Sequence, residues 1–284
     1  MPNIRDLRKR IRTVENIKRI TSAMEKIAAA RLFRSKGTLA SSKPYVEALA
    51  RMANDLLNSQ PEAVHPLVEA NDQGYVLAIL VTSDRGLCGG YNTRVIQAAV
   101  DFADKVGRDK VKFVVFGRKG VDFLAKRGYE IVISHTGLPG QLTPEFTEQV
   151  SAKVIDLYLA KTVSEVHVVM TEFASVARHI PRVVRVLPVA RLPETGRNYM
   201  NYSYEPAAGA TIAAILPKLV RIRIWSAIVE STVSEHAARM FMMQRATKNT
   251  DDVIALLTLV MNKARQTAIT RELTDIVGAA ETIA

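Results

Sequence analysis

Glycine and proline are absent from two long stretches of this 284-residue chain, and their absence limits what it can fold into. Neither residue occurs in residues 3–36 or in residues 218–277. Because glycine and proline are the residues that most readily interrupt a helix, both stretches are predicted to be unbroken helices. The second would be about 90 Å long at about 1.5 Å per residue. Much of its surface must therefore pack on another helix or on partner chains.

Apolar side chains recur every three or four residues along both stretches, which is typical of a coiled-coil seam. In the first stretch they are Ile4, Leu7, Ile11, Val14, Ile17, Thr21, Met24, Ala28 and Leu32. A looser series in the second stretch is Leu219, Ile222, Val229, Val233, Met240, Met243, Ile254, Leu257, Met261, Ala264 and Ala268. We predict terminal helices at residues 1–58 and 209–284 that pair as an antiparallel coiled coil. Two helices of an ordinary bundle are the alternative, which the length of the second stretch disfavours.

Residues 72–190 alternate between apolar runs and amphipathic segments, which predicts a central α/β domain. The expected strands are residues 75–82, 112–116, 130–134, 165–170 and 183–187. The expected helices are residues 92–106, 121–127 and 143–160. Continuous apolar strands that alternate with helices indicate a mainly parallel, Rossmann-like sheet covered on both faces. This architecture by itself does not imply a bound nucleotide.

The turn after the first predicted strand, residues 83–92, is the first place to look for chemistry. A glycine-rich turn between a strand and a helix can bind phosphate through its backbone N–H groups. However, Gly86, Gly89 and Gly90 do not fit G-x-G-x-x-G, and no G-K-[ST] follows. Cys88 has no histidine near it in the sequence that could serve as a base. A tight turn for packing or a partner contact is the favoured interpretation, and a nucleotide-dependent enzyme using this turn is an alternative.

The sequence predicts no metal site, cofactor or catalytic residue. The five histidines are scattered without ligand spacing, and a single cysteine cannot form a disulfide or a CxxC pair within the chain. The longest apolar stretch, residues 254–261, is too short to span a bilayer. We expect a soluble protein that is at most peripheral to a membrane.

The positive charge of the chain is concentrated at one end. The formal net charge is +11, and +9 of it falls on residues 1–43. A basic coiled-coil nucleic-acid-binding protein is therefore a second alternative. Proteins that bind single-stranded nucleic acids interleave aromatic side chains with basic ones, whereas Phe33 is the only aromatic residue in this segment.

Five segments carry a resemblance to a known family. Residues 83–90 read SDRGLCGG, and residues 17–32 form the basic and alanine-rich part of the first predicted helix. Residues 230–240, 246–249 and 262–278 lie in the last predicted helix. Taken in chain order, the five segments resemble the gamma subunit of F-type ATP synthases. The resemblance runs from one end of the chain to the other and implies the fold described above.

The resemblance implies a rotary central-stalk subunit that is not itself catalytic. In the family, the coiled coil lies inside the hexamer of alpha and beta subunits, and the α/β domain lies against the epsilon subunit and the ring of c subunits. Ion flow turns the ring and the shaft, which drives ATP synthesis or hydrolysis in the beta subunits and helps regulate ATPase activity and proton flow. The implied location is the cytoplasmic face of the bacterial cell membrane, with indirect membrane association and no nucleic acid.

The resemblance also assigns residues to partner contacts. Arg265 and Gln266 would engage a loop of one beta subunit, and Met24 would lie near the acidic lever of beta. The turn at residues 84–90 would approach the same lever, with Arg85 as the anion partner. The complete set implied to bind the hexamer is Met24, Arg85, Cys88, Arg265, Gln266, Thr270, Glu272 and Asp275.

The cationic first helix has a corresponding interpretation. A basic surface facing acidic segments of beta gains long-range complementarity without fixed pairs, which suits contacts that break and reform during rotation. The residues expected to form this basic surface are Arg8, Lys9, Arg10 and Arg12. Solvation of part of this face is the alternative, since individual exposed ion pairs contribute little.

Overall fold

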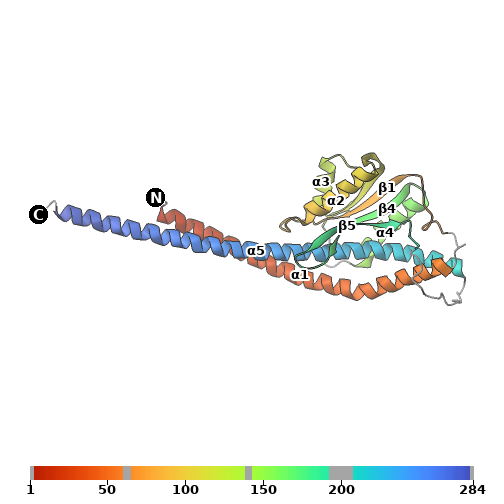
Figure 1. Cartoon of the computed structure of the whole chain (residues 1–284), viewed down its shortest axis with the longest axis horizontal. Coiled ribbons are helices and arrows are strands. Elements are labelled where there is room, and N and C mark those ends of the chain that lie inside the picture. Colours follow the sequence, from red (N-terminus) through yellow and green to blue (C-terminus); the bar gives the residue numbers. More distant parts are fainter. Residues whose placement is uncertain (1–2, 60–64, 138–142, 192–206, 282–284) are drawn as a thin grey trace. The chain divides into compact units, whose positions relative to one another are not determined.

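The computed structural model describes residues 3–59, 65–137, 143–191 and 207–281. The chain divides into two compact units, Met1–Ala28 with Met240–Ala284, and Ala29–Arg239. Helices α1 (Ile4–Ser59) and α5 (Ala208–Glu281) contribute residues to both units (Figure 1). The expected fold class is confirmed: terminal helices accompany a mainly parallel five-stranded α/β domain. We call Ala29–Arg239 the sheet unit and the other the two-helix unit.

The sheet unit contains all five strands, in the spatial order β3-β2-β1-β4-β5. The strands are β1 (Tyr75–Val81), β2 (Val111–Phe116), β3 (Ile131–His135), β4 (Val163–Phe173) and β5 (His179–Leu187). The helices between them are α2 (Tyr91–Val106), the short 3-10 helix η1 (Arg108–Lys110), α3 (Arg118–Lys126) and α4 (Pro144–Leu159). Each predicted strand and helix of the centre is present, with ends that differ by a few residues.

The fifth strand departs from a purely parallel sheet. Strands β1, β2, β3 and β4 pair in parallel, whereas β5 runs antiparallel to β4. Only five residues separate the end of β4 from the start of β5, and a parallel crossover needs a dozen or more. Both strands are also longer than predicted, because polar residues such as Ser164 and Glu172 of β4 and Arg182 of β5 interrupt the continuous apolar pattern used to find them.

Helices cover both faces of the sheet, as Figure 1 shows. Ala78 and Leu80 of β1 point to the face covered by α2 and α3. Leu77 and Ile79 point to the opposite face, where they pack in a core with α4 and with segments of α1 and α5. This alternation along β1 produces two separate cores, and the second one ties the terminal helices to the sheet.

Helix α1 continues through Gly37 and Pro44, two residues that usually weaken a helix interior. Its last three turns bury Leu49, Ala53 and Leu57 in the core beneath the sheet. Burial of a side chain such as leucine contributes about 1.5–3 kcal/mol, so this packing offsets a local cost of similar size at the proline.

The two-helix unit is an antiparallel pair, as the seam predicted. Thr247 donates a hydrogen bond to the hydroxyl of Thr21 at 2.9 Å, and Lys18 pairs with Asp251 at 2.5 Å. From the first of these contacts to the second, the residue number falls on α1 and rises on α5, so the two helices run in opposite directions. Most seam residues of α1 are buried or half-buried, but Ile17 is 45% exposed. It follows two consecutive steps of three residues, Ile11 to Val14 and Val14 to Ile17, which shift the apolar series around the helix.

Candidate functional site

The turn between β1 and α2, residues 82–90, is held by hydrogen bonds within it and to the first turn of α2. The Ser83 hydroxyl donates to the Arg85 carbonyl at 2.7 Å, and the Ser83 backbone N–H donates to Oδ1 of Asn92 at 3.0 Å. Leu87 and Gly89 have positive φ angles of 64° and 58°. Positive φ is costly for a leucine, so the surroundings must hold this conformation in place.

Cys88 lies inside this turn. Its side chain is 2% exposed and packs with Tyr91 of α2 and Ala238 of α5. The side-chain amide of Asn92 donates to its sulfur at 3.2 Å. The thiol thus has an intramolecular role in this conformation, and any partner contact of the turn falls to other side chains.

Arg85 and Leu87 form the outward face of the turn. The side chain of Arg85 is exposed, and Leu87 is 59% exposed. A cation beside an exposed apolar side chain is a small surface that suits an acidic partner segment. The sequence predicted Arg85 as the anion partner in this turn, and the structure places its side chain on the surface, whereas Leu87 had no signal beyond its place in the motif.

Helix α5 supplies a buried charged cluster behind the turn, formed by Glu235, His236 and Arg239. Nη1 of Arg239 is 2.5 Å from Oε1 of Glu235, and all three residues are buried. Burial raises the pKa of Glu235, and Arg239 opposes this shift. Burial and the nearby charges of Arg239, Arg31 and Arg34 lower the pKa of His236 to about 4, so its imidazole is neutral at pH 7.

The same region of α5 forms hydrogen bonds with the end of β4. The pairing of β4 with β1 stops at Val169, while β4 continues to Phe173. On this projecting end, the Thr171 backbone N–H donates to the Ser231 hydroxyl at 2.9 Å, and the Ser234 hydroxyl donates to the Thr171 carbonyl at 3.0 Å. Side chains of α5 thereby replace the neighbouring strand.

Two further hydrogen bonds extend this contact between α5 and the sheet. The Phe173 backbone N–H donates to Oε1 of Glu230 at 3.2 Å. The Tyr91 hydroxyl, which is fully buried, donates to the Ser231 carbonyl at 3.0 Å. Burial is the main cause of the raised pKa of Tyr91. The residues of α5 that form these polar contacts are Glu230, Ser231 and Ser234, and Arg239 bonds to the turn after β1.

Sequence reasoning missed this set of attachment residues as functional positions. A usable signal exists, because α5 has polar residues where a coiled-coil seam continues on both sides. Ser231, Ser234 and His236 fall among Val229, Val233 and Met240 of the predicted apolar series. Polar side chains that interrupt a seam without ending the helix indicate a specific hydrogen-bonded contact.

The other predicted contact residues lie in the two-helix unit. Met24 of α1 is half-buried, and Arg265, Gln266, Thr270 and Glu272 of α5 are exposed. The side chain of Asp275 lies outside the described residues. The structure therefore places four of the polar positions on the surface of one helix segment, where Gln266 and Thr270 line an open groove with Lys263, Thr267, Arg271 and Thr274.

The basic surface predicted on α1 is accessible. Arg8, Lys9, Arg10 and Arg12 are all exposed. Large apolar side chains of the same unit are also exposed, namely Ile20 and Ile27 of α1 and Val253, Leu256, Leu259, Ile269, Leu273, Ile276 and Val277 of α5. An isolated soluble pair of helices seldom leaves so many large apolar residues in water, so this surface indicates contact with partner chains.

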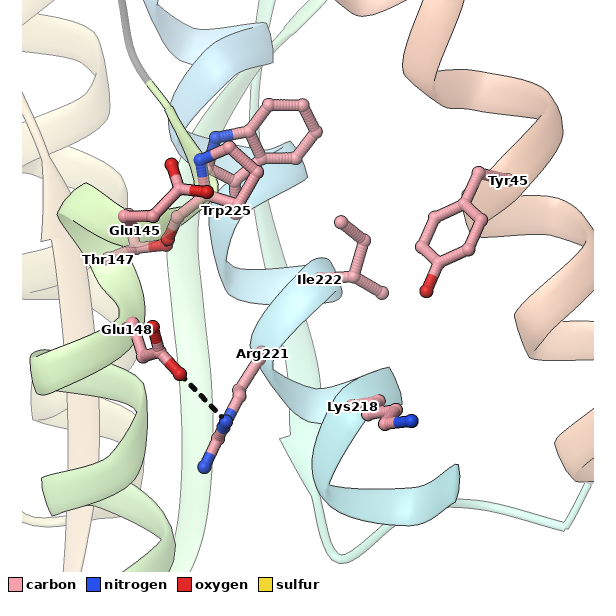
Figure 2. Close-up of a pocket in the computed structure, with 9 residues that line it drawn as sticks. Tyr45, Glu145, Thr147, Glu148, Lys218, Arg221, Ile222 and Trp225 are labelled. Atoms are coloured by element: carbon pink, nitrogen blue, oxygen red, sulfur yellow. Dashed lines mark hydrogen bonds and ion pairs between the residues drawn. The ribbon is translucent and has the colours of Figure 1, made fainter. Parts of the chain in front are cut away.

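A cleft in the sheet unit has no features of a nucleotide site. Figure 2 shows Glu148 of α4 and Tyr45 of α1 on opposite sides of it, with Arg221 and Trp225 of α5 between them. Its volume is about 280 Å³, slightly below the about 300–1,000 Å³ that is typical of ligand pockets. Arg221 is paired with Glu148 at 3.1 Å. Its charge is therefore compensated within the protein and offers little excess attraction for phosphate.

The described residues contain neither a metal-binding cluster nor a membrane-spanning helix. In those parts of the chain, no group of three or more His, Cys, Asp or Glu side chains is arranged to hold a metal ion. Over the same described ranges, no helix is long and apolar enough to cross a membrane.

Comparisons with known proteins agree with the geometry. The family model for ATP synthase matches residues 3–283. The ATP synthase gamma chain of Nitratidesulfovibrio vulgaris (strain DSM 19637 / Miyazaki F) is 36% identical over 291 residues, covering 100% of this chain and 99% of that protein. The gamma chain of Pelotomaculum thermopropionicum is 35% identical over 281 residues, covering 99% of each chain.

Solved structures share the fold at lower sequence identity. A chain of the rotor of Euglena gracilis mitochondrial ATP synthase matches with a TM-score of 0.63 and 16% identity, covering 94% of this chain and 98% of that one. A chain of the central stalk and c-ring of the Tetrahymena thermophila mitochondrial enzyme matches with a TM-score of 0.61 and 17% identity, covering 80% and 99%. With relatives above 30% identity along its whole length, the chain belongs to the ATP synthase gamma chain family.

Proposed function

We propose that this protein is the rotating central-stalk subunit of an F-type ATP synthase. The observation that carries the proposal is similarity along the full length to gamma chains, which includes both terminal helices and the turn at residues 83–90. The subunit couples ion flow across the membrane to ATP synthesis or hydrolysis in the alpha and beta subunits. It is non-catalytic, and nucleotide chemistry belongs to those partners.

The two-helix unit is the part proposed to lie inside the alpha and beta hexamer. Its exposed apolar side chains, such as Leu256, Leu259 and Ile276, supply a surface without fixed polar pairs, which suits sliding contact. Arg265, Gln266, Thr270 and Glu272, together with Asp275, supply polar contacts to a beta subunit. Met24, which is half-buried, is proposed to lie near the acidic lever of beta.

Charged groups on the surface complete the proposed contact with beta. Arg8, Lys9, Arg10 and Arg12 are exposed, and so is Arg85 in the sheet unit. Exposed ion pairs contribute only about 0–1 kcal/mol each, so their combined field matters more than any single pair. The proposed partner of this surface is a set of acidic segments of beta.

The sheet unit is the part proposed to meet the epsilon subunit and the ring of c subunits. The complex is membrane-bound, and this chain is a peripheral component of it. We place it on the cytoplasmic face of a bacterial cell membrane, because the gamma chains that it resembles at 34–36% identity come from bacteria.

The direct test is co-expression with alpha and beta subunits. Purification should yield an ATPase-active complex that contains this chain, and its consistent absence from that complex would refute the proposal. A variant with aspartate at all four positions, Arg8, Lys9, Arg10 and Arg12, should impair assembly or coupling. The circular dichroism of the isolated chain should stay unchanged. Unaltered coupling would exclude the electrostatic part of the proposal.

Two rival functions have their own readouts. Salt-dependent binding of the purified chain to DNA or RNA at physiological ionic strength would favour a nucleic-acid-binding protein. Binding of a nucleotide to the chain, lost on substitution within residues 83–92, would favour an enzyme. We expect neither.

A further inference from the structure

Arg239 reaches from α5 to two consecutive backbone carbonyls of the turn at residues 82–90. Its Nη2 donates to the Arg85 carbonyl at 3.1 Å, and its Nε donates to the Gly86 carbonyl at 3.4 Å. Its Nη1 donates to Glu235 at 2.5 Å, and the residue is only 8% exposed. The planar guanidinium is suited to this task, because its donors diverge in a fixed geometry toward several acceptors at once.

The turn depends on contacts of this kind because its backbone is locally unfavourable. Leu87, the residue that follows the two carbonyls, has a φ of 64°. The base of the turn is fixed elsewhere: Thr82 bonds to β2, and Oδ1 of Asp84 accepts a hydrogen bond from the Arg118 N–H at the start of α3. Arg239 is the group from α5 that holds the segment carrying Arg85 and Leu87.

We propose that Arg239 is a positioning residue that holds the turn in the conformation presenting Arg85 and Leu87 outward. The functional part of this inference rests on the proposed function, in which that face of the turn contacts an acidic partner. Arg239 does not make the partner contact itself, since it is buried and its donors serve acceptors within the chain. It acts on the partner through the backbone of Arg85.

Cys88 provides a built-in reporter of the turn. It is the single cysteine of the chain and is 2% exposed in the closed turn. A thiol reagent such as 5,5′-dithiobis(2-nitrobenzoic acid) reaches it only when the turn opens. The rate of labelling of the folded full chain therefore measures the opening of the turn without any partner present.

The main variant replaces the buried pair together, Glu235→Gln with Arg239→Met, so that no lone carboxylate is left buried. Loss of hydrogen bonds from a charged donor should raise the Cys88 labelling rate about 10- to 100-fold. Arg239→Lys keeps a positive charge beside Glu235 but loses the diverging donors of the guanidinium, so it should raise the Cys88 labelling rate by an intermediate amount. Of the two variants, it is the one that disturbs folding least. Arg245→Met, at an exposed arginine of the same helix, should label at the original rate.

The inference would be overturned if either Arg239 variant, shown by unchanged circular dichroism to be folded, labelled Cys88 within about twofold of the rate of the original chain. In the assembled complex, Arg85→Ala and the Arg239 substitutions should reduce ATP-driven ion pumping non-additively, because they act on one contact. Additive losses would overturn the positioning role and indicate separate effects. If the Arg239 variants make Cys88 reactive while Arg85→Ala leaves pumping intact, Arg239 does position the turn, but the proposed contact of the turn with a partner is wrong.

Discussion

Replacing Ser231 with alanine tests the attachment of α5 to the end of β4. The substitution removes one hydroxyl that accepts a hydrogen bond from the Thr171 backbone N–H at 2.9 Å. Alanine is a good helix former, so α5 itself is not weakened. The effect should therefore come from the strand amide that loses its acceptor.

The expected cost follows from the burial of both groups. Ser231 is 0% exposed and Thr171 is 2% exposed, so water cannot replace the hydroxyl without local opening. Strand β1 ends at Val81, and its pairing with β4 stops at Val169, so no strand carbonyl takes over. A buried N–H without a partner costs about 1–3 kcal/mol, and we expect about 2 kcal/mol here.

Native-state hydrogen exchange is the appropriate assay, because a chain with two compact units does not guarantee two-state unfolding. A cost of about 2 kcal/mol corresponds to roughly 30-fold faster exchange of the Thr171 amide, since about 1.4 kcal/mol is tenfold. Thr232→Ala is the matched control. Among the described residues the Thr232 hydroxyl bonds to the Ile228 carbonyl of the same helix alone, so Thr171 should keep its protection. A change below about threefold in Ser231→Ala would refute the reasoning.

Three further substitutions test other parts of the structure. His236 has a pKa of about 4 in the folded chain and about 6.5 in the unfolded chain. Because the unfolded chain binds the proton more readily, the free energy of unfolding should fall by up to about 3 kcal/mol as pH drops from about 6.5 to 4. Denaturant unfolding of His236→Gln should not show this loss. Gly117→Ala should cost at least about 2 kcal/mol in the same assay, because φ is +95° and a Cβ would lie 2.2 Å from the Thr82 carbonyl oxygen. Reversing the exposed pair, Lys18→Asp with Asp251→Lys, should change the melting temperature by little, since exposed pairs contribute about 0–1 kcal/mol; a large loss would indicate a more specific contact.

The sequence predicts the elements of the fold well where one periodicity dominates. Strand β1 is a continuous apolar run and β2 is one apart from Lys112, and the predicted bounds of both agree with the structure to within a residue. The bounds of β5 were less predictable, because its residues 182–185 are exposed and include two arginines. Its antiparallel direction follows from the short connection to β4 rather than from its own residues.

The candidate site was predictable only in part, because a seam pattern ranks residues by hydrophobicity and says nothing about hydrogen-bond partners. Arg85, Arg265, Gln266, Thr270 and Glu272 were predicted as contact residues from the motif resemblance, and their side chains are exposed. Arg239 lies in the motif at residues 230–240, but the resemblance assigned it no role, and an arginine on a long helix is normally solvated. Its role depends on two carbonyls more than 150 residues away in the sequence, which only the fold brings near.

The placement of polar groups on α5 has a mechanical consequence for a subunit that rotates. Residues of α5 such as Leu216 and Ile224 pack in an apolar core, and hydrophobic contact is non-directional, so it resists separation more than it resists rotation of the helix about its axis. The hydrogen bonds of Ser231 and Ser234 to Thr171 depend on angle and distance. They fix one face and one axial register of α5 against the sheet. A helix held in this way can transmit a turning force to the sheet unit without slipping, which is why buried polar residues interrupt the seam at this point.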